Sequence, residues 1–256
     1  MDNPIRTALE GDEVVFGARV TTHDPMIIEV YGELGFDFVW IDFEHGGASP
    51  HETGALDGLA RACDVADVAP LVRVPSADEA IVRKVLDAGL HTILVPRVES
   101  AAEAREAVGL ARFTYDGAPG HRGHAGTRAN TYGASFEVYA ERADATTLVG
   151  VQIETADGMS NLEGILAVPD LGFIVIGSGD LAVSLGHPMK REHTVVEDAV
   201  EEIRSACLDA GVPVGTPVST TAAAEDAVAA GYQLIRIGDE LNSIRETLGD
   251  RLKSVR

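Results

Sequence analysis

Two acidic residues, Glu154 and Asp180, each follow an apolar run of the kind that forms a buried strand. Neighbouring parallel strands lie about 4.8 Å apart and end at one edge of a sheet, so these carboxylates would converge. Carboxylates that close repel one another unless a cation lies between them. Mg²⁺ and Mn²⁺ take one or two carboxylates and leave room for water and a substrate oxygen. We therefore predict a divalent-metal site at Glu154 and Asp180; the alternative is that Asp180 caps a helix and Glu154 caps one or pairs with an arginine.

The turn Gly177-Ser178-Gly179-Asp180 has the composition of an anion-binding turn. Glycine lets the backbone approach a ligand closely, and free N–H groups at the start of a helix bind a carboxylate. Arg73, at the end of another apolar run, could grip a carboxylate through two parallel hydrogen bonds. The alternative for Arg73 is an ion pair with a neighbouring carboxylate inside the protein.

Asp42 and His45 lie three residues apart, directly after an apolar run. A carboxylate that accepts a hydrogen bond from one imidazole nitrogen fixes the tautomer and raises the basicity of the other nitrogen. The spacing predicts His45 as a general base held by Asp42, with Glu44 between them able to orient either neighbour. The alternative is a turn in which Asp42 caps a helix and His45 is solvated.

The remaining residues that could carry chemistry fit no such arrangement. Cys63 and Cys207 make no metal or disulfide pattern, and we expect buried thiols in a reducing compartment. We expect surface or packing positions for four histidines, His51, His91, His187 and His193. The glycine-rich stretch 114–133 is long for a loop, which favours a functional role. It carries His121, Arg122, His124 and Arg128. These side chains either contact the distal end of a substrate or pair with surplus acidic groups.

Eight short β-branched runs alternate with longer, alanine-rich amphipathic segments along the chain. The runs are continuously apolar, as expected of parallel strands covered on both faces. Eight strands each followed by a helix are typical of a (β/α)₈ TIM barrel, an α/β fold of roughly 250 residues, so we predict a single barrel domain over residues 1–256. A doubly wound open sheet is the alternative, but no G-x-G-x-x-G follows the first run. The predicted strands are Val14–Val20, Phe36–Asp42, Pro70–Val74, Thr92–Val98, Thr147–Glu154, Phe173–Gly177, Val212–Val218 and Tyr232–Gly238.

Three helix starts carry specific signals. Asp24-Pro25 places proline at a first helical position. Ser76–Glu79 and Ser100–Glu103 read as capping boxes. In a barrel of this kind the active site lies where the strands end, at the C-terminal face. The polar residues after the predicted strands are therefore expected to gather there.

The chain carries 41 acidic and 20 basic residues, a formal net charge of −21, and only three lysines. A field this negative repels nucleic acid and anionic membranes, so neither is an expected partner. Salt would screen the self-repulsion, since the Debye length shrinks to ~3 Å at 1 M, and the composition is typical of a halophilic protein from a high-salt cytoplasm. No run approaches the roughly 20 apolar residues of a membrane span, and the N-terminus has no secretory pattern, which predicts a cytoplasmic protein.

Five segments, taken together and in order, resemble one known family. They are WIDFEHG (Trp40–Gly46), LVRVP (Leu71–Pro75), ILVPRVES (Ile93–Ser100), HRGHAGTR (His121–Arg128) and VQIETADGMSNLEGILAVPDLGFIVIGSGDLAVSLG (Val151–Gly186). The chain resembles the metal-dependent (class II) pyruvate aldolases, the family of hydroxyheptenedioate aldolase and 2-dehydro-3-deoxyglucarate aldolase, related to the citrate lyase β-chain superfamily. The resemblance covers nearly the whole chain, and its ordered set of motifs is specific.

The resemblance implies a (β/α)₈ barrel of the phosphoenolpyruvate/pyruvate-binding type, assembled as a homo-oligomer (trimer or hexamer) with the last helix swapped between subunits. It implies that Glu154 and Asp180 hold Mg²⁺, Mn²⁺ or Co²⁺, with Gln152 beside the metal. Many relatives read G-P-A-D where this chain reads GSGD at 177–180, so the turn lacks the rigidity of proline. The loop 114–133 also differs from that of relatives in detail.

The reaction that the resemblance implies is reversible cleavage of a 4-hydroxy-2-oxoacid to pyruvate and an aldehyde. The substrate would be a 2-keto-3-deoxy sugar acid or a hydroxyheptenedioate-like diacid. His45 and Asp42 would form the acid–base pair, Arg73 would bind the 2-oxoacid end and stabilise the enolate, and the amides around Gly179 and Asp180 would receive the pyruvate carboxylate. No Schiff-base lysine is available at a strand end, because the three lysines fall in helices or loops: Lys84, Lys190 and Lys253.

Two other functions compete with this one. A malyl- or citryl-CoA-type lyase would share the barrel and both carboxylates, but the scarcity of lysine offers little for a nucleotide to bind. A non-catalytic barrel that binds a 2-oxoacid could lose the pair formed by His45 and Asp42 without penalty, so the presence of that pair favours catalysis. The fold alone would not decide among these functions.

Overall fold

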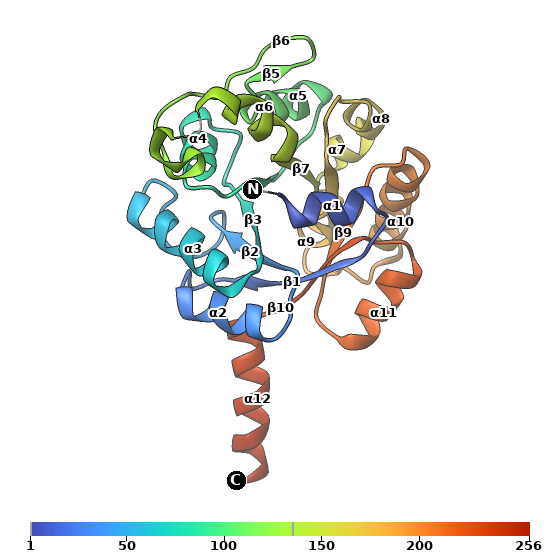
Figure 1. Ribbon diagram of the computed structural model, residues 1–256. Coiled ribbons are helices and arrows are strands. Elements are labelled where there is room, and N and C mark those ends of the chain that lie inside the picture. Colours follow the sequence, from blue (N-terminus) through green and yellow to red (C-terminus); the bar gives the residue numbers. More distant parts are fainter. Residues whose placement is uncertain (1, 135) are drawn as a thin grey trace.

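The predicted strands close into a parallel barrel in the computed structural model, which describes residues 2–134 and 136–256 (Figure 1). The open-sheet alternative is wrong, because the first and last strands pair with each other, for example Val15 with Leu234. The barrel strands are β1 (Val15–Val20), β2 (Phe38–Asp42), β3 (Ala69–Arg73), β4 (Thr92–Val95), β7 (Leu148–Ile153), β8 (Phe173–Ile176), β9 (Val214–Val218) and β10 (Leu234–Asp239). Around the barrel they follow the order β1-β10-β9-β8-β7-β4-β3-β2.

Helices surround the barrel, and the predicted loop 114–133 contains structure of its own (Figure 1). The loop holds an antiparallel hairpin, β5 (Thr114–Tyr115) with β6 (Ala118–Pro119), and a 3₁₀ segment, η1 (Arg128–Gly133). The helices are α1 (Pro4–Glu10), α2 (Pro25–Glu33), α3 (Thr53–Ala66), α4 (Glu79–Asp87), α5 (Ala101–Leu110), α6 (Phe136–Thr146), α7 (Ala156–Ser160), α8 (Leu162–Leu166), α9 (Ser178–Ser184), α10 (Thr194–Asp209), α11 (Thr221–Ala229) and α12 (Glu240–Ser254).

Two of the three helix starts are confirmed and one is wrong. Asp24 caps α2 and Ser100 caps α5, each by accepting a backbone N–H of the first turn. The start predicted at Ser76 is wrong, because Asp78 caps α4 instead. Aspartate is as good an N-cap as serine. The Ser76 carbonyl accepts the backbone N–H of Asp78 at 2.8 Å, which makes a turn that precedes the helix.

The barrel interior is a hydrophobic cluster separate from the one between the barrel and its helices. Its largest side chains below 2% exposure are the rings of Phe38 on β2 and Phe173 on β8. Two glycines on neighbouring strands make room for them. A Cβ at Gly17 would lie 2.4 Å from the Phe38 ring, and a Cβ at Gly150 would lie 2.3 Å from the Phe173 ring. These positions therefore admit only glycine while both rings keep their places.

α1 closes the N-terminal end of this interior (Figure 1). Ile5 and Leu9 of α1 belong to the same buried cluster as the barrel side chains. Asn3 caps α1 and also donates to Thr92 Oγ1 at 2.9 Å and to the carbonyl of Thr146 at 3.0 Å. The side chains of α1 thus cover the interior at the N-terminal ends of the strands.

α12 extends away from the barrel (Figure 1). In a regular barrel, the helix that follows β10 would pack on the outside of the barrel. Because β10 lies between β1 and β9, that position is between α2 and α11. Instead α12 exposes an apolar face whose members are each at least 45% exposed: Leu241, Ile244, Leu248, Leu252 and Val255. α2 and its C-cap also expose apolar side chains, Met26, Val30 and Leu34.

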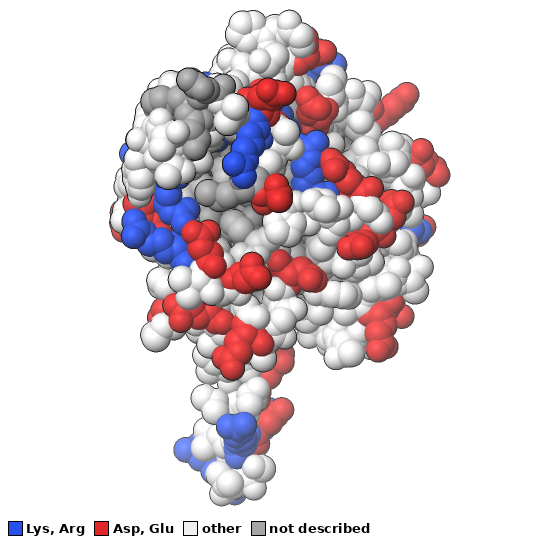
Figure 2. All heavy atoms as spheres, viewed as in Figure 1, with Lys and Arg blue, Asp and Glu red and all other residues white. Residues whose placement is uncertain are grey.

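The surface reflects the acidic composition. Acidic side chains outnumber basic ones on the face shown in Figure 2. In the described part of the chain, no helix combines the length and the apolar character that crossing a membrane requires. The high-salt environment inferred from the composition stays a prediction.

Candidate active site

A cavity of about 160 Å³ opens at the C-terminal ends of the barrel strands. Its lining includes His45, Arg73, Gln152, Ser178, Gly179 and Asp180. Asp42 and Glu154 lie directly beside it, since Asp42 is hydrogen-bonded to Arg73 and Glu154 to Gln152. The structure thus gathers the residues proposed for catalysis, substrate binding and metal binding around one opening of the barrel, apart from those of the stretch 114–133.

The guanidinium of Arg73, at the end of β3, makes a two-bonded ion pair with Asp42, at the end of β2. Nε donates to Oδ1 at 2.9 Å and Nη2 donates to Oδ2 at 2.6 Å, and both side chains are buried. Burial by itself would raise the pKa of Asp42, but the hydrogen bonds and charge of Arg73 outweigh it, so this pKa lies below its usual value. The two guanidinium N–H groups predicted to bind a substrate carboxylate therefore bind Asp42 instead. The structure agrees with the alternative, in which Arg73 forms an ion pair inside the protein.

The environment of His45 also differs from the prediction. Asp42 does not accept from the imidazole; its Oδ1 accepts the backbone N–H groups of Glu44 and His45, at 3.1 and 3.4 Å. The imidazole Nε2 lies 3.6 Å from Glu44 Oε2, which is also 2.8 Å from Arg73 Nη1. Glu44, named from the sequence only as a possible orienting group, is therefore the carboxylate next to both side chains. The His45 side chain is 60% exposed, so a substrate can reach it.

Glu154 follows β7 and is 1% exposed. Its Oε1 accepts the backbone N–H of Arg97 at 2.9 Å, and its Oε2 accepts Gln152 Nε2 at 2.5 Å. The alternative for Glu154 was a pairing with an arginine side chain. The structure shows instead a hydrogen bond from the backbone N–H of Arg97. Burial, followed by repulsion from Glu44 and Asp180, raises the pKa of Glu154 to about 7. A carboxylate in this position is held ionised most readily by a cation.

The turn after β8 brings Asp180 toward Glu154. β7 and β8 are neighbours, as the metal-site prediction requires. Gly177 is the N-cap of α9 and Asp180 lies within its first turn, so the alternative in which Asp180 is the cap is wrong. A Cβ at Gly177 would lie 2.5 Å from both Gln152 Nε2 and Glu154 Oε2. Glycine is therefore required for the turn to pass this close to Glu154.

Two observations indicate that the carboxylates at this site could bind a hard divalent cation. Glu44 and Asp180 both act electrostatically on the buried Glu154. Glu44 Oε2 is buried and accepts no hydrogen bond, although Arg73 Nη1 is near. Within residues 2–134 and 136–256, no three His, Cys, Asp or Glu side chains are already grouped as metal ligands. Glu154 and Asp180 would therefore share a cation with water and substrate oxygens, an arrangement that Mg²⁺ commonly adopts.

Arg122 and Arg128, in the stretch 114–133, lie at the other end of the barrel. Arg122 donates to Thr147 Oγ1 at 3.1 Å and Arg128 donates to the carbonyl of Ala88 at 2.8 Å. Thr147 and Ala88 precede β7 and β4, whose opposite ends face the cavity. Within one subunit these arginines therefore do not reach the cavity. Arg128 pairs with Asp64, as the other option predicted, and both arginines hold the stretch against the barrel.

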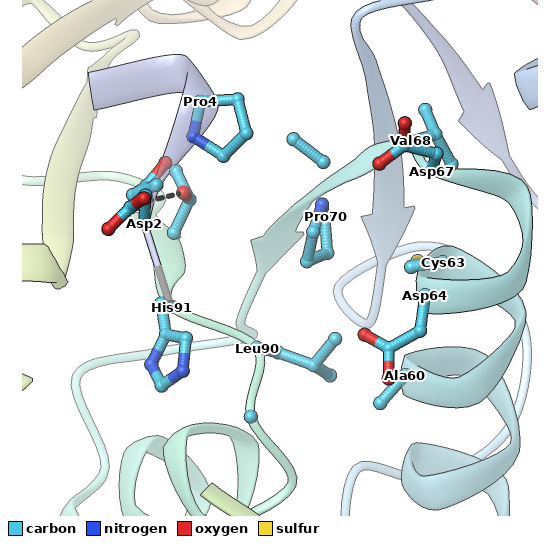
Figure 3. Close-up of a pocket in the computed structure, with 14 residues that line it drawn as sticks. Asp2, Pro4, Ala60, Cys63, Asp64, Asp67, Val68, Pro70, Leu90 and His91 are labelled. Atoms are coloured by element: carbon cyan, nitrogen blue, oxygen red, sulfur yellow. Dashed lines mark hydrogen bonds between the residues drawn. The ribbon is translucent and has the colours of Figure 1, made fainter. Parts of the chain in front are cut away.

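A second cavity, of about 220 Å³, lies at that opposite end of the barrel (Figure 3). Asp2 and Pro4 border it on one side, and Cys63 and Asp64 of α3 border it on the other. It contains none of the residues proposed for catalysis. Cys63 and Cys207 are free and buried, as predicted, and burial raises the pKa of each thiol to about 12.

The cavity at the C-terminal ends of the strands is also lined by three further arginines and a tryptophan: Arg19, Arg191, Arg236 and Trp40. None belongs to the constellations proposed from the sequence. The available signal was an arginine in the middle of an apolar run, in GARV and in LIRIG. A charge inside a buried strand is uncommon unless something there pairs with it.

A closed α/β barrel with a cavity lined by charged side chains at its C-terminal opening has the architecture of a barrel enzyme for small molecules. A family model described as HpcH/HpaI aldolase/citrate lyase matches residues 16–247, and the chain belongs to this family. It is 34% identical over 258 residues to a hydroxypyruvate/pyruvate aldolase of Paraburkholderia phytofirmans, covering 99% of this chain and 98% of the relative. It is 30% identical over 254 residues to a 5-keto-4-deoxy-D-glucarate aldolase of Shigella dysenteriae, covering 98% and 97%.

The fold comparison agrees with the sequence comparison. The crystal structure of a HpcH/HpaI aldolase/citrate lyase family protein from Burkholderia cenocepacia matches with a TM-score of 0.92 and 34% identity, over 99% of each chain. Relatives named as aldolases match nearly the full length of the chain. The protein is therefore an enzyme of the carbon–carbon lyase class.

Proposed function

We propose that the protein cleaves a 4-hydroxy-2-oxoacid reversibly to pyruvate and an aldehyde, and that it requires a divalent metal ion. The observation that carries the proposal is the buried Glu154 at the opening of a closed barrel, where the charges of two other carboxylates, Glu44 and Asp180, act on it. The names of the relatives support a substrate that yields pyruvate or hydroxypyruvate. Glu154 and Asp180 are the proposed metal ligands.

A divalent ion at Glu154 and Asp180 would supply Lewis-acid stabilisation of the 2-oxo and carboxylate oxygens. Arg73 contributes a positive charge beside the same cavity, where negative charge develops on the 2-oxo oxygen. The two hydrogen bonds to Asp42 fix the guanidinium before a substrate arrives. Asp42 is therefore a positioning residue for Arg73, rather than the partner of His45.

His45 is the group proposed to accept the proton of the 4-hydroxyl. When the hydroxyl loses its proton, the C3–C4 bond breaks, C4 becomes the aldehyde carbon, and the electron pair passes to a pyruvate enolate. A proton added at C3 then gives pyruvate. Glu44 Oε2 lies 3.6 Å from the imidazole Nε2, so Glu44 is the carboxylate placed to orient the ring.

Metal dependence is tested by chelation and by thermal unfolding. Activity should disappear in EDTA and return with Mg²⁺, Mn²⁺ or Co²⁺. An ion at one hundred times its Kd adds about 2.7 kcal/mol to the free energy of unfolding, which raises Tm by roughly 5–10 °C. The rise should be larger at about pH 8 than at about pH 5.5, because Glu154, with a pKa of about 7, must lose a proton to bind the ion. Full activity in EDTA would contradict the proposal.

The role of His45 is tested by His45→Ala. We expect kcat to fall by about 10²- to 10⁴-fold, as for loss of a general base, while the rise of Tm with metal is unchanged. His51→Ala is the matched control, because His51 is an exposed histidine a few residues further along. An unchanged cleavage rate in His45→Ala would remove His45 from the mechanism.

We also infer that the protein is a homo-oligomer in which α12 covers the barrel of a neighbouring subunit. α12 leaves its own barrel with an apolar face exposed, and α2 exposes apolar side chains of its own (Figure 1). Exposed apolar faces of this extent indicate an interaction surface. We propose a second copy of the chain as the partner, because it presents both the apolar face of α12 and the apolar side chains of α2.

A further inference from the structure

The cavity at the opening of the barrel holds more positive charge than the proposed mechanism uses. Four arginines line it: Arg19 on β1, Arg73 on β3, Arg236 on β10, and Arg191 in the segment between α9 and α10. The whole chain has only 20 basic residues against 41 acidic ones. Arg73 is accounted for, because its guanidinium is bound to Asp42 and lies close to Glu44. The other three arginines have no part in the reaction as proposed, and Arg19 and Arg236 are the two that lie on barrel strands.

Arg236 has no carboxylate partner. Its Nη1 donates to the carbonyl of Gly238 at 3.2 Å, and none of the described acidic side chains lies within ion-pair distance of it. The guanidinium lies 5.9 Å from the centre of the Trp40 ring. Burial, together with the charges of Arg19 and Arg73, lowers the pKa of Arg236 to about 10, so it remains a cation at neutral pH. Arg236 is partly buried, and a partly buried cation without a carboxylate partner is stabilised when an anion joins it.

Two buried N–H donors on the lining residues also lack acceptors. They are the indole Nε1 of Trp40, a residue that is 3% exposed, and Nε of Arg19. The remaining nitrogens of Arg19 are engaged, with Nη2 3.1 Å from Asp239 and Nη1 3.6 Å from Asp42. Leaving a buried donor unpaired costs about 1–3 kcal/mol, so native proteins pair such groups with protein, water or ligand.

We propose that Arg19, Trp40 and Arg236 form a binding pocket for a second carboxylate of the substrate, distinct from its 2-oxoacid carboxylate. The natural substrate is then a dicarboxylic 4-hydroxy-2-oxoacid, and the aldehyde that it releases also carries a carboxylate. A carboxylate has enough acceptor positions for a guanidinium and an indole N–H at once. The identity of this ligand rests on the proposed aldolase function, whereas the pocket itself can be tested without turnover.

The pocket can be tested directly because Trp40 is the single tryptophan of the chain. In EDTA and at constant ionic strength, succinate should change the intrinsic fluorescence in a saturable way, and uncharged succinamide should not. Arg236→Met and Arg19→Met should each weaken succinate binding at least about tenfold, while Arg236→Lys should weaken it less. Arg61→Met, at an exposed arginine of α3, is the control and should bind as wild type. Thermal unfolding identifies any variant that fails to fold.

Substrate selectivity gives the second test. In the condensation direction, pyruvate C3 joins the aldehyde carbon of either succinic semialdehyde or butanal, which have the same number of carbons and differ in the carboxylate. We expect kcat/KM to favour succinic semialdehyde by about 100-fold, and this ratio to fall at least tenfold in Arg236→Met.

The outcomes separate the two claims. If no aldehyde reacts, the proposed function fails, and the fluorescence titration still decides on the pocket. If both aldehydes react equally, or if folded Arg236→Met binds succinate as wild type does, the pocket is refuted and the aldolase function stands. If Arg236→Met weakens pyruvate as much as succinate, the arginines hold the 2-oxoacid carboxylate itself, which also overturns the inference.

Discussion

Replacing Glu154 with glutamine is expected to reduce kcat/KM for the cleavage of 4-hydroxy-2-oxoacids at least about 1000-fold. The amide can still accept the backbone N–H of Arg97, but its own N–H₂ would meet Gln152 Nε2 as donor to donor. The negative charge that should hold a metal ion is lost as well. The rise of Tm with added Mg²⁺ or Mn²⁺ should therefore disappear together with the activity, and both are measured on the same preparation.

Two further variants make this experiment specific. Glu163→Gln makes the same chemical change at an exposed position of α8, and should leave cleavage and the metal-induced rise of Tm as in wild type. Asp180→Asn removes the other proposed ligand at an exposed position, where packing is little disturbed, and should reproduce the losses of Glu154→Gln. Metal-dependent turnover near the wild-type rate in Glu154→Gln would rule out Glu154 as a ligand.

The second large effect is expected on assembly. Two substitutions on the apolar face of α12, Leu248→Asp with Leu252→Asp, should convert the oligomer to monomers in light scattering coupled to size exclusion. Both side chains are about half exposed in the isolated subunit, so the change leaves the barrel core untouched. Each new carboxylate would have to be buried at the subunit interface without a partner. Because burying an unpaired charge is costly, the interface should not form.

Lys253→Asp is the matched control for charge. It changes the net charge by the same two units, on a side chain that is 81% exposed and pairs only with Asp250. A surface pair of this kind contributes little, so the oligomer should persist. A wild-type protein that is monomeric at micromolar concentration would show that α12 has no partner in another copy of this chain.

The barrel was predictable from the sequence because its strands are continuously apolar and each is followed by a helical segment with recognisable caps. The location of the candidate site residues at the barrel opening was predictable for a related reason, since polar residues such as Gln152 and Glu154 stand at the ends of such runs. Their hydrogen-bond partners were not predictable. Asp42 accepts from Arg73 because the register of β2 and β3 sets these two residues side by side, and register is a property of three-dimensional pairing.

The functions assigned to charged loop residues show the same limit. Arg122 and Arg128 looked available for substrate from the sequence, yet they bind groups at the N-terminal ends of the strands. Arg19 and Arg236, which line the cavity, lie inside apolar strands. The hydrophobic pattern of the sequence shows only that they are exceptions to it. The side on which a charge lies depends on the path of the whole chain, and short motifs do not encode it.

The placement of α1 bears on how the chain matures during translation. Ile5 and Leu9 leave the ribosome before any barrel strand, yet they pack inside a ring that closes only when β10 pairs with β1. Until nearly the whole polypeptide has emerged, these two apolar side chains have no finished surface to receive them. Closure of the ring and docking of α1 are therefore late, coupled events, and a stalled nascent chain would present its amino-terminal helix to chaperones.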